Sequence, residues 1–169
     1  ITRTFPVNGK FSAPQKRIYE AVLKVQKNLV SMVRPGVRFH DIHDACVEQL
    51  TDAMLELGLL KGNRKALIES NEFKKYFPHG TGHWLGMDVH DCGIYRIDGK
   101  SRMLEPGMCF TIEPGLYDPG DDMTAPAEYR GIGIRIEDDV HVTASGVENL
   151  TALAPKDVEA MESIIGKGV

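Results

Sequence analysis

Residues 77–91 read FPHGTGHWLGMDVHD, and the pattern of the chain changes at this run. Upstream of it, apolar residues recur at helical spacing in two long segments. Downstream of it, glycines separate short apolar stretches, which is typical of strands joined by tight turns. The sequence therefore predicts a single α+β domain in which helices pack on an antiparallel sheet.

Two helices are predicted before this run. Ser12 and Gln15 have the spacing of a capping box at the start of the first helix. Its apolar stripe consists of Ile18, Val22, Val25, Leu29 and Val33. The second helix is expected to begin at Asp41 or just before it and to stop at Gly58. Residues 64–76 predict one or two further short helical turns.

Four more elements are predicted after the run: strands over residues 108–113, 132–142 and 147–151, and a helix over residues 155–165. In the longest strand, isoleucines alternate with other residues, so Arg135 and Glu137 are expected to share a face. Asp138 and Asp139, which follow, are interpreted as solvated or turn residues.

Composition excludes several classes of function. The net charge of −4 provides no basic field for nucleic acid, and no stretch approaches the roughly 18 apolar residues of a membrane span. The three cysteines, Cys46, Cys92 and Cys109, are odd in number and widely spaced. They indicate buried thiols in a reducing compartment, and hence a cytoplasmic protein.

The histidines divide into two groups. His79 and His83 flank a Gly-Thr-Gly segment, and their even spacing places both on one face of an extended chain. His90 lies between Asp88 and Asp91, which are expected to orient its ring or raise its pKa. The other three are interpreted as ordinary core or surface residues: His40, His43 and His141.

Two glutamates stand in apolar strands. Glu113 ends a strand just before a Pro-Gly pair, and Glu137 alternates with isoleucines. A carboxylate in such a setting is costly unless a cation neutralises it, and a divalent metal is the strongest candidate. A salt bridge from Arg135 to Glu113 is the alternative explanation.

One histidine and two glutamates are a suitable ligand set for a divalent ion that also holds a water molecule. Such an ion lowers the pKa of the water toward ~7 and polarises a scissile carbonyl. Histidines outside the ligand set can stabilise the tetrahedral intermediate or move protons. From the residues alone, the hypothesis is a hydrolytic metalloenzyme of unspecified substrate.

Three sequence motifs, in the same order along the chain as in a known family, carry a resemblance to it: residues 79–91, 104–117 and 129–139. They closely resemble the proline-specific branch of the pita-bread metallopeptidases, the aminopeptidase P group, and the likeness extends over nearly the whole chain. Prolidases, which cleave Xaa-Pro dipeptides, share similar motifs. Trp84 and the YRGIGI segment favour the aminopeptidase P group.

The resemblance implies a pita-bread fold and the release of the N-terminal residue from peptides with proline in second place. It also implies a site with two divalent ions, usually manganese, although cobalt and zinc accept such ligands too. The metal ligands that the resemblance implies are His83, Glu113 and Glu137, the last bridging both ions. His79 and His90 match histidines that contact substrate or stabilise the intermediate, and Arg135 matches the arginine before the bridging glutamate.

In that family two further ligands, both aspartates, lie upstream of the segment that matches Ile1. We therefore expect residues 1–169 to form a partial catalytic domain without the upstream half-site and the N-terminal domain. Such a chain is expected to hold at most one metal ion weakly, and to be inactive or dependent on a partner.

Three alternatives stay open. The first is a prolidase, and the second is a non-catalytic binding module on the same fold. The third is a chain that assembles with the missing half, supplied as a separate polypeptide. Because a half-sheet exposes strand edges, the isolated chain is expected to self-associate as a homo-oligomer or to aggregate.

Overall fold

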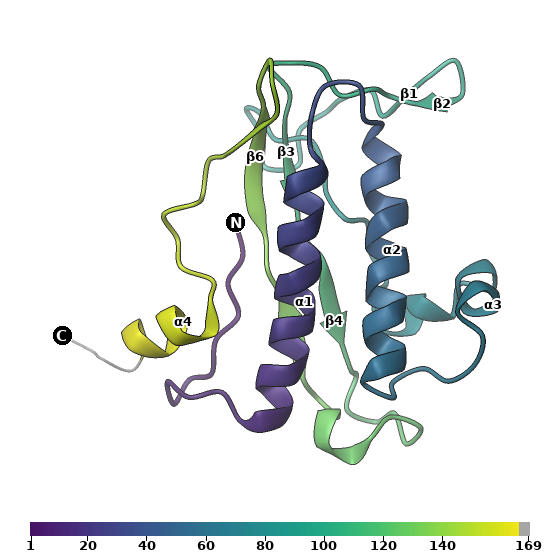
Figure 1. Cartoon of the computed structure of the whole chain (residues 1–169), viewed down its shortest axis with the longest axis vertical. Coiled ribbons are helices and arrows are strands. Elements are labelled where there is room, and N and C mark those ends of the chain that lie inside the picture. Colours follow the sequence, from purple (N-terminus) through teal and green to yellow (C-terminus); the bar gives the residue numbers. More distant parts are fainter. Residues whose placement is uncertain (166–169) are drawn as a thin grey trace.

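The computed structural model describes residues 1–165. Two long helices, α1 (Ala13–Met32) and α2 (Phe39–Glu56), lie side by side and run in opposite directions over a layer of short strands (Figure 1). The predicted α+β architecture is confirmed.

Helix α1 forms as its sequence predicts. The Ser12 side chain accepts a hydrogen bond from the Gln15 N–H, and the Gln15 side chain accepts one from the Ser12 N–H, which completes the capping box. The whole predicted stripe is buried against the strands: Ile18, Val22, Val25, Leu29 and Val33.

Helix α2 packs beside α1 and ends at Gly58, whose φ of +72° is the left-handed conformation that favours glycine. The predicted short helical turns follow as α3 (Arg64–Glu69) and the 3₁₀ helix η1 (Glu72–Lys75). Together these elements form one apolar layer over the strands.

The strands form three small antiparallel sheets. Their bounds are β1 (Arg96–Ile97), β2 (Lys100–Ser101), β3 (Cys109–Ile112), β4 (Gly115–Tyr117), β5 (Gly133–Arg135), β6 (Asp138–Val142) and β7 (Val147–Asn149). Strand β3 pairs with β6, which pairs with β7; β4 pairs with β5, and β1 with β2.

The prediction of one continuous strand over residues 132–142 is wrong, because β5 and β6 belong to different sheets. The cause lies in the partner segment, where Pro114 separates β3 from β4 and has no N–H to donate to a ladder. The register is nevertheless the same on both sides of the break, with Ile112 opposite Asp138 and Gly115 opposite Arg135. Strands β3 and β4 on one side and β6 and β5 on the other therefore form one ribbon in a single register. The interruption of this ribbon at Pro114 is called the kink below.

The chain closes with β7 and α4 (Val158–Ile164), as predicted. Val158 and Met161 are buried, whereas Ile164 is half exposed. Strand β7 therefore completes the β3–β6 sheet, and α4 contacts α1 and joins the core through one turn of apolar side chains.

The interpretation of Asp138 as a solvated residue is wrong, because its side chain is fully buried. Five side chains from distant segments donate to its two oxygens: Arg3, Gln26, Asn149, Thr151 and Lys156. Burial raises the pKa of Asp138, but hydrogen bonds from Lys156 and Arg3 outweigh it and hold the pKa well below its usual range.

The network around Asp138 predicts a specific dependence of stability on pH. The pKa of Asp138 in the folded chain lies below the value of about 3.9 in the unfolded chain. Its stabilising effect is therefore complete above about pH 5 and is lost as the pH falls through the folded pKa. Asp138→Asn is expected to lower the free energy of unfolding at pH 7 by about 3–5 kcal/mol, since two cations lose their buried partner.

Urea denaturation at pH 7 and pH 3 measures this effect, with Asp98→Asn on the exposed β1–β2 turn as the matched control. The difference between wild type and Asp138→Asn should shrink at pH 3. An equal difference at both pH values would contradict the role given to the charge.

The expectation of buried thiols holds for only part of the set. Cys46 is buried, and burial raises its pKa to about 12, whereas Cys109 is half-buried and Cys92 is exposed. Within residues 1–165, no helix has the length and apolar character needed to cross a bilayer.

Apolar side chains are exposed along residues 87–103, which include the β1–β2 hairpin: Met87, Val89, Ile94, Tyr95, Ile97 and Met103. An exposed cluster of this kind favours association. We predict that the isolated chain sediments as a concentration-dependent oligomer in analytical ultracentrifugation. A monomer at all concentrations up to the millimolar range would contradict this.

Candidate metal centre

The segment that carries His83 lies along the free edge of β3. The Thr111 N–H donates to the His83 carbonyl (3.0 Å) and the Glu113 N–H donates to the Thr81 carbonyl (2.7 Å), so the segment pairs with β3 like a further strand. At Gly82 a Cβ would stand 1.9 Å from the Thr111 carbonyl oxygen, so only glycine permits this approach. Backbone pairing thereby fixes the position of His83.

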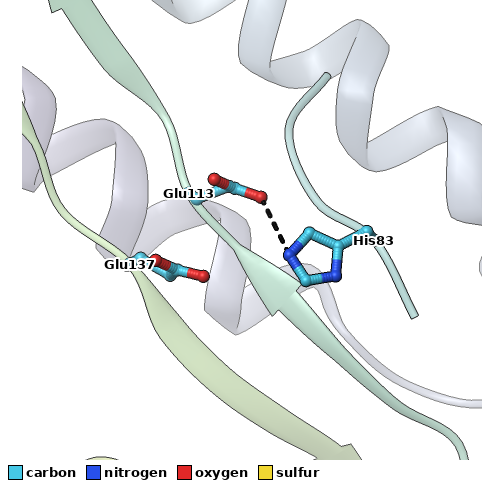
Figure 2. A group of neighbouring side chains, drawn as sticks. All are labelled: His83, Glu113 and Glu137. Atoms are coloured by element: carbon cyan, nitrogen blue, oxygen red, sulfur yellow. Dashed lines mark ion pairs between the residues drawn. The ribbon is translucent and has the colours of Figure 1, made fainter. Parts of the chain in front are cut away.

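Three side chains converge beside the kink of the ribbon: His83, Glu113 and Glu137. One potential ligand atom from each lies within 4.8 Å of the other two. His83 Nε2 is 3.5 Å from Glu113 Oε1, and Glu137 approaches from the neighbouring strand (Figure 2). Because the register continues across the kink, Glu113 and Glu137 lie opposite each other on one face.

The tautomer of His83 suits a metal ligand. Its Nδ1 lies 2.9 Å from the carbonyl oxygen of Trp84. A carbonyl can only accept, so Nδ1 carries a proton, and in the neutral form of the ring Nε2, directed at Glu113, is the nitrogen with the lone pair. Histidine ligands typically donate a hydrogen bond of this kind from the ring nitrogen that does not bind the metal.

Thr111 supports two of the three side chains, although the sequence analysis did not single it out. Its hydroxyl accepts from the His83 N–H (3.0 Å) and donates to Glu113 Oε1 (3.2 Å). Thr111 is buried, and it precedes Glu113 by two residues on the same face of β3. Alternation along the strand is the signal that points to it.

Ion pairing alone does not account for the two glutamates. Arg135 Nη1 stands 3.7 Å from Glu113 Oε2, and the α-amino group of Ile1 stands 3.7 Å from Glu137 Oε2. Both distances exceed that of a hydrogen bond. The alternative salt bridge is therefore present but loose, and it does not include His83, whose Nε2 also faces Glu113.

His79 belongs to a separate chain of hydrogen bonds at the edge of the centre. Its Nδ1 lies 2.7 Å from the Gly80 carbonyl oxygen, so Nδ1 carries the proton and Nε2 accepts from the Tyr117 hydroxyl (2.7 Å). Arg135 Nε donates to the same hydroxyl (2.7 Å). Burial raises the pKa of Tyr117, so the phenol is neutral at pH 7.

Tyr117 therefore connects two predicted site residues, and the sequence analysis missed it. It lies on β4 immediately after the Glu-Pro-Gly-Leu segment, where a tyrosine by itself gives no sign of a partner across the sheet. His79 and Arg135 are brought together only by this hydroxyl.

His90 lies against His83, with ring centroids 4.3 Å apart and the rings nearly perpendicular. It is exposed, on an irregular segment. The expected orientation of its ring by Asp88 or Asp91 is not borne out, because no hydrogen bond joins His90 to either aspartate in the described part of the chain. Asp91 instead accepts from the Cys92 N–H.

The remaining histidines lie outside this group. His40 is 3.5 Å from Asp44, and His141 is 3.1 Å from Glu148, both at the surface. His43 Nδ1 is 2.9 Å from the Thr81 hydroxyl, so it ties α2 to the segment that carries His83. Burial, followed by nearby His40, lowers the pKa of His43.

The donor set fits a divalent cation by its chemistry: one neutral imidazole nitrogen and two carboxylates, delivered by three backbone segments. The sequence pattern of metallopeptidase family M24 matches residues 1–144. The chain belongs to this family.

Curated relatives of this M24 chain are similar over nearly all of it. It is 47% identical over 165 residues to a Xaa-Pro aminopeptidase of Haemophilus influenzae, covering 98% of this chain and 38% of that protein. Xaa-Pro aminopeptidase 3 of Homo sapiens is 44% identical over 167 residues, covering 97% of this chain and 32% of that protein. The chain thus spans about a third of the length of such relatives.

Solved structures agree on the fold. Pseudomonas aeruginosa aminopeptidase PepP superposes with a TM-score of 0.94 at 47% identity, covering 96% of this chain and 37% of that one. A zinc-substituted Escherichia coli aminopeptidase P in complex with product superposes with a TM-score of 0.90 at 46% identity, covering 96% of this chain and 37% of that one. The pita-bread fold expected from the resemblance is confirmed.

The geometry predicts that the chain binds a divalent ion through His83. His83→Ala is expected to weaken binding of Mn²⁺ at least tenfold, because it removes the only nitrogen donor of the three-residue group. Isothermal titration calorimetry measures the affinity, with His141→Ala, at the distant Glu148 pair, as the control. Equal affinities of wild type and His83→Ala would contradict the assignment.

Proposed function

We propose that this chain is the C-terminal part of the catalytic domain of a metal-dependent aminopeptidase, which releases the N-terminal residue from peptides with proline in second place. The observation that carries the proposal is the convergence of the His83 nitrogen with the carboxylates of Glu113 and Glu137. The similarity to Xaa-Pro aminopeptidases over nearly the whole chain supports the substrate class.

In this proposal His83, Glu113 and Glu137 hold the cation, and manganese is the ion we expect. A bound divalent cation supplies an activated water and polarises the scissile carbonyl. Thr111 keeps His83 and Glu113 in their relative positions, so that the donors are arranged before the ion binds. Since the family pattern includes two further aspartates, we expect these three residues alone to bind one ion weakly.

The histidines act on the substrate. His79 accepts from the Tyr117 hydroxyl in its neutral form, so its imidazole is oriented by Tyr117 and held by Arg135 through that hydroxyl. His79 and His90 are assigned to substrate contact and to the negative charge that develops on the carbonyl oxygen. Arg135, near Glu113, orients both that glutamate and Tyr117.

Proline in second place makes a particular demand on such a site. The nitrogen of the scissile bond belongs to proline and carries no hydrogen. A site that recognises its substrate through an N–H donor at this position cannot bind such a peptide. Recognition must come from the shape of the ring and from the carbonyl, which this proposal assigns to His79 and His90. The aromatic surroundings of His79, formed by Phe77 and Tyr117, suit this requirement.

Peptidase activity tests the proposal. We expect an Xaa-Pro-containing tripeptide to be cleaved in the presence of Mn²⁺ by a longer form of the chain with an added upstream segment that supplies the two aspartates. Residues 1–169 alone should show little or no turnover. Glu137→Ala in the longer form should reduce kcat at least 100-fold, because the loss of a ligand disturbs the ion that activates the water.

Two outcomes would redirect the proposal. Cleavage of Xaa-Pro dipeptides in preference to tripeptides would identify a prolidase. No cleavage in either form, with metal bound and the chain folded, would identify a binding module. His141→Ala in the longer form is the control, and its activity should match that of the unsubstituted protein.

A further inference from the structure

Arg3 makes an unusually complete set of contacts near the metal centre. All five N–H donors of its guanidinium have an acceptor: Nε donates to Pro155 O (2.9 Å), Nη1 to Thr2 O (2.9 Å) and Glu137 O (2.6 Å), and Nη2 to Asp138 Oδ1 (2.7 Å) and Ala154 O (3.0 Å). Its side chain is 12% exposed. One of these acceptors is the backbone carbonyl of Glu137, a metal ligand in the proposed function.

Glu137 receives this contact on the edge of its strand that faces away from Glu113. The β4–β5 ladder ends at Arg135, and the β3–β6 ladder begins at Asp138. The peptide groups of Glu137 are held by the N-terminal segment: its N–H donates to the Thr2 carbonyl (3.0 Å), and its carbonyl accepts a short hydrogen bond from Arg3 (2.6 Å) and a longer one from the Thr2 N–H (3.4 Å). The Thr2 hydroxyl also donates to the Glu137 carboxylate.

Arg3 is itself held in place from the other side. It donates to Asp138, whose carboxylate is bound by side chains of α1 and of the segment from β7 to α4. The planar guanidinium therefore links a rigid buried anchor to the carbonyl of the adjacent residue, Glu137. Lysine cannot do this, since its three donors radiate from one point and do not match a planar array of five acceptors.

We propose that Arg3 is a positioning residue for the metal centre, fixing the backbone of Glu137 at the kink so that its carboxylate faces His83 and Glu113. The inference rests on the proposed function of these three residues as metal ligands. Arg3 acts through Glu137 and does not touch the ion. Its contribution is expected in the affinity and in the coordination geometry of the metal.

Arg3→Lys tests the inference, because it keeps a positive charge near Asp138 while losing the planar contact with Glu137. The matched control is Lys156→Gln, which removes a cation from the same carboxylate and makes no contact with Glu137. Mn²⁺ affinity is measured by calorimetry, the geometry of bound Co²⁺ by its visible absorption, and stability by urea denaturation, all on residues 1–169.

We expect Arg3→Lys to weaken Mn²⁺ binding about 10- to 100-fold and to change the Co²⁺ spectrum, as is typical when a partner that orients a ligand is lost. Lys156→Gln should lower the urea midpoint and leave Mn²⁺ affinity within about twofold of wild type, since the contacts of Glu137 survive. A purely structural role would affect stability in both variants and the Co²⁺ spectrum in neither.

The remaining outcomes separate the two proposals. Wild-type affinity in folded Arg3→Lys, or equal losses of affinity in Arg3→Lys and Lys156→Gln, would overturn the positioning role alone. No Mn²⁺ binding by wild type, or unchanged binding by His83→Ala, would overturn the metal centre and this inference with it. If Arg3→Lys does not fold, Arg3→Gln is the second variant; failure of both to fold would make Arg3 a structural residue only.

Discussion

Two carboxylates face each other across a kinked ribbon, and most of the site follows from that arrangement. Glu113 and Glu137 occupy opposite positions in one antiparallel register, on the same face, with most of each side chain buried. Like charges in such positions repel, so this arrangement costs stability unless cations lie nearby. The loose ion pair from Arg135 reduces the cost, and His83 Nε2, the ring nitrogen that is not bonded to a carbonyl, faces the same point and makes it suitable for a metal ion.

The kink that creates this arrangement has a local cause and distant supports. Pro114 interrupts the ladder because it has no N–H to donate to Ile136, its partner in the register, while the peptide groups of Glu137 point to the opposite edge, away from Glu113. The N-terminal segment supplies their hydrogen bonds through Thr2 and Arg3. The buried Asp138 fixes Arg3 in turn. The position of Glu137 therefore depends on the register opposite Glu113 on one edge and on Thr2 and Arg3 on the other.

Local signals in the sequence were sufficient for the helices and for selecting Glu113 and Glu137 as candidate metal ligands, whereas the resemblance selected His83 among the histidines. The capping box of Ser12 and the apolar stripe of α1 depend on residues within a few turns, and both are found as predicted. Glu113 and Glu137 could be selected because a carboxylate in an apolar strand is unusual wherever it occurs. Their convergence with His83 is what the structure adds.

The failures share a different cause, which is contact between segments far apart in the chain. The break between β5 and β6 follows from a proline in the partner strand, so residues 132–142 do not reveal it by themselves. Asp138 reads as a solvated residue until Arg3 and Lys156 are brought beside it. Thr111 and Tyr117 gain their roles only through His83, His79 and Arg135, none of which is a sequence neighbour.

The most direct measurement of the metal centre is anomalous X-ray diffraction from crystals of the chain soaked in manganese. We expect one anomalous peak within about 2.0–2.3 Å of His83 Nε2 and of carboxylate oxygens of Glu113 and Glu137, the range of divalent-metal bonds to such ligands. A peak at other residues, or none at this point while soaked crystals show manganese elsewhere, would contradict the assignment of these three side chains as ligands.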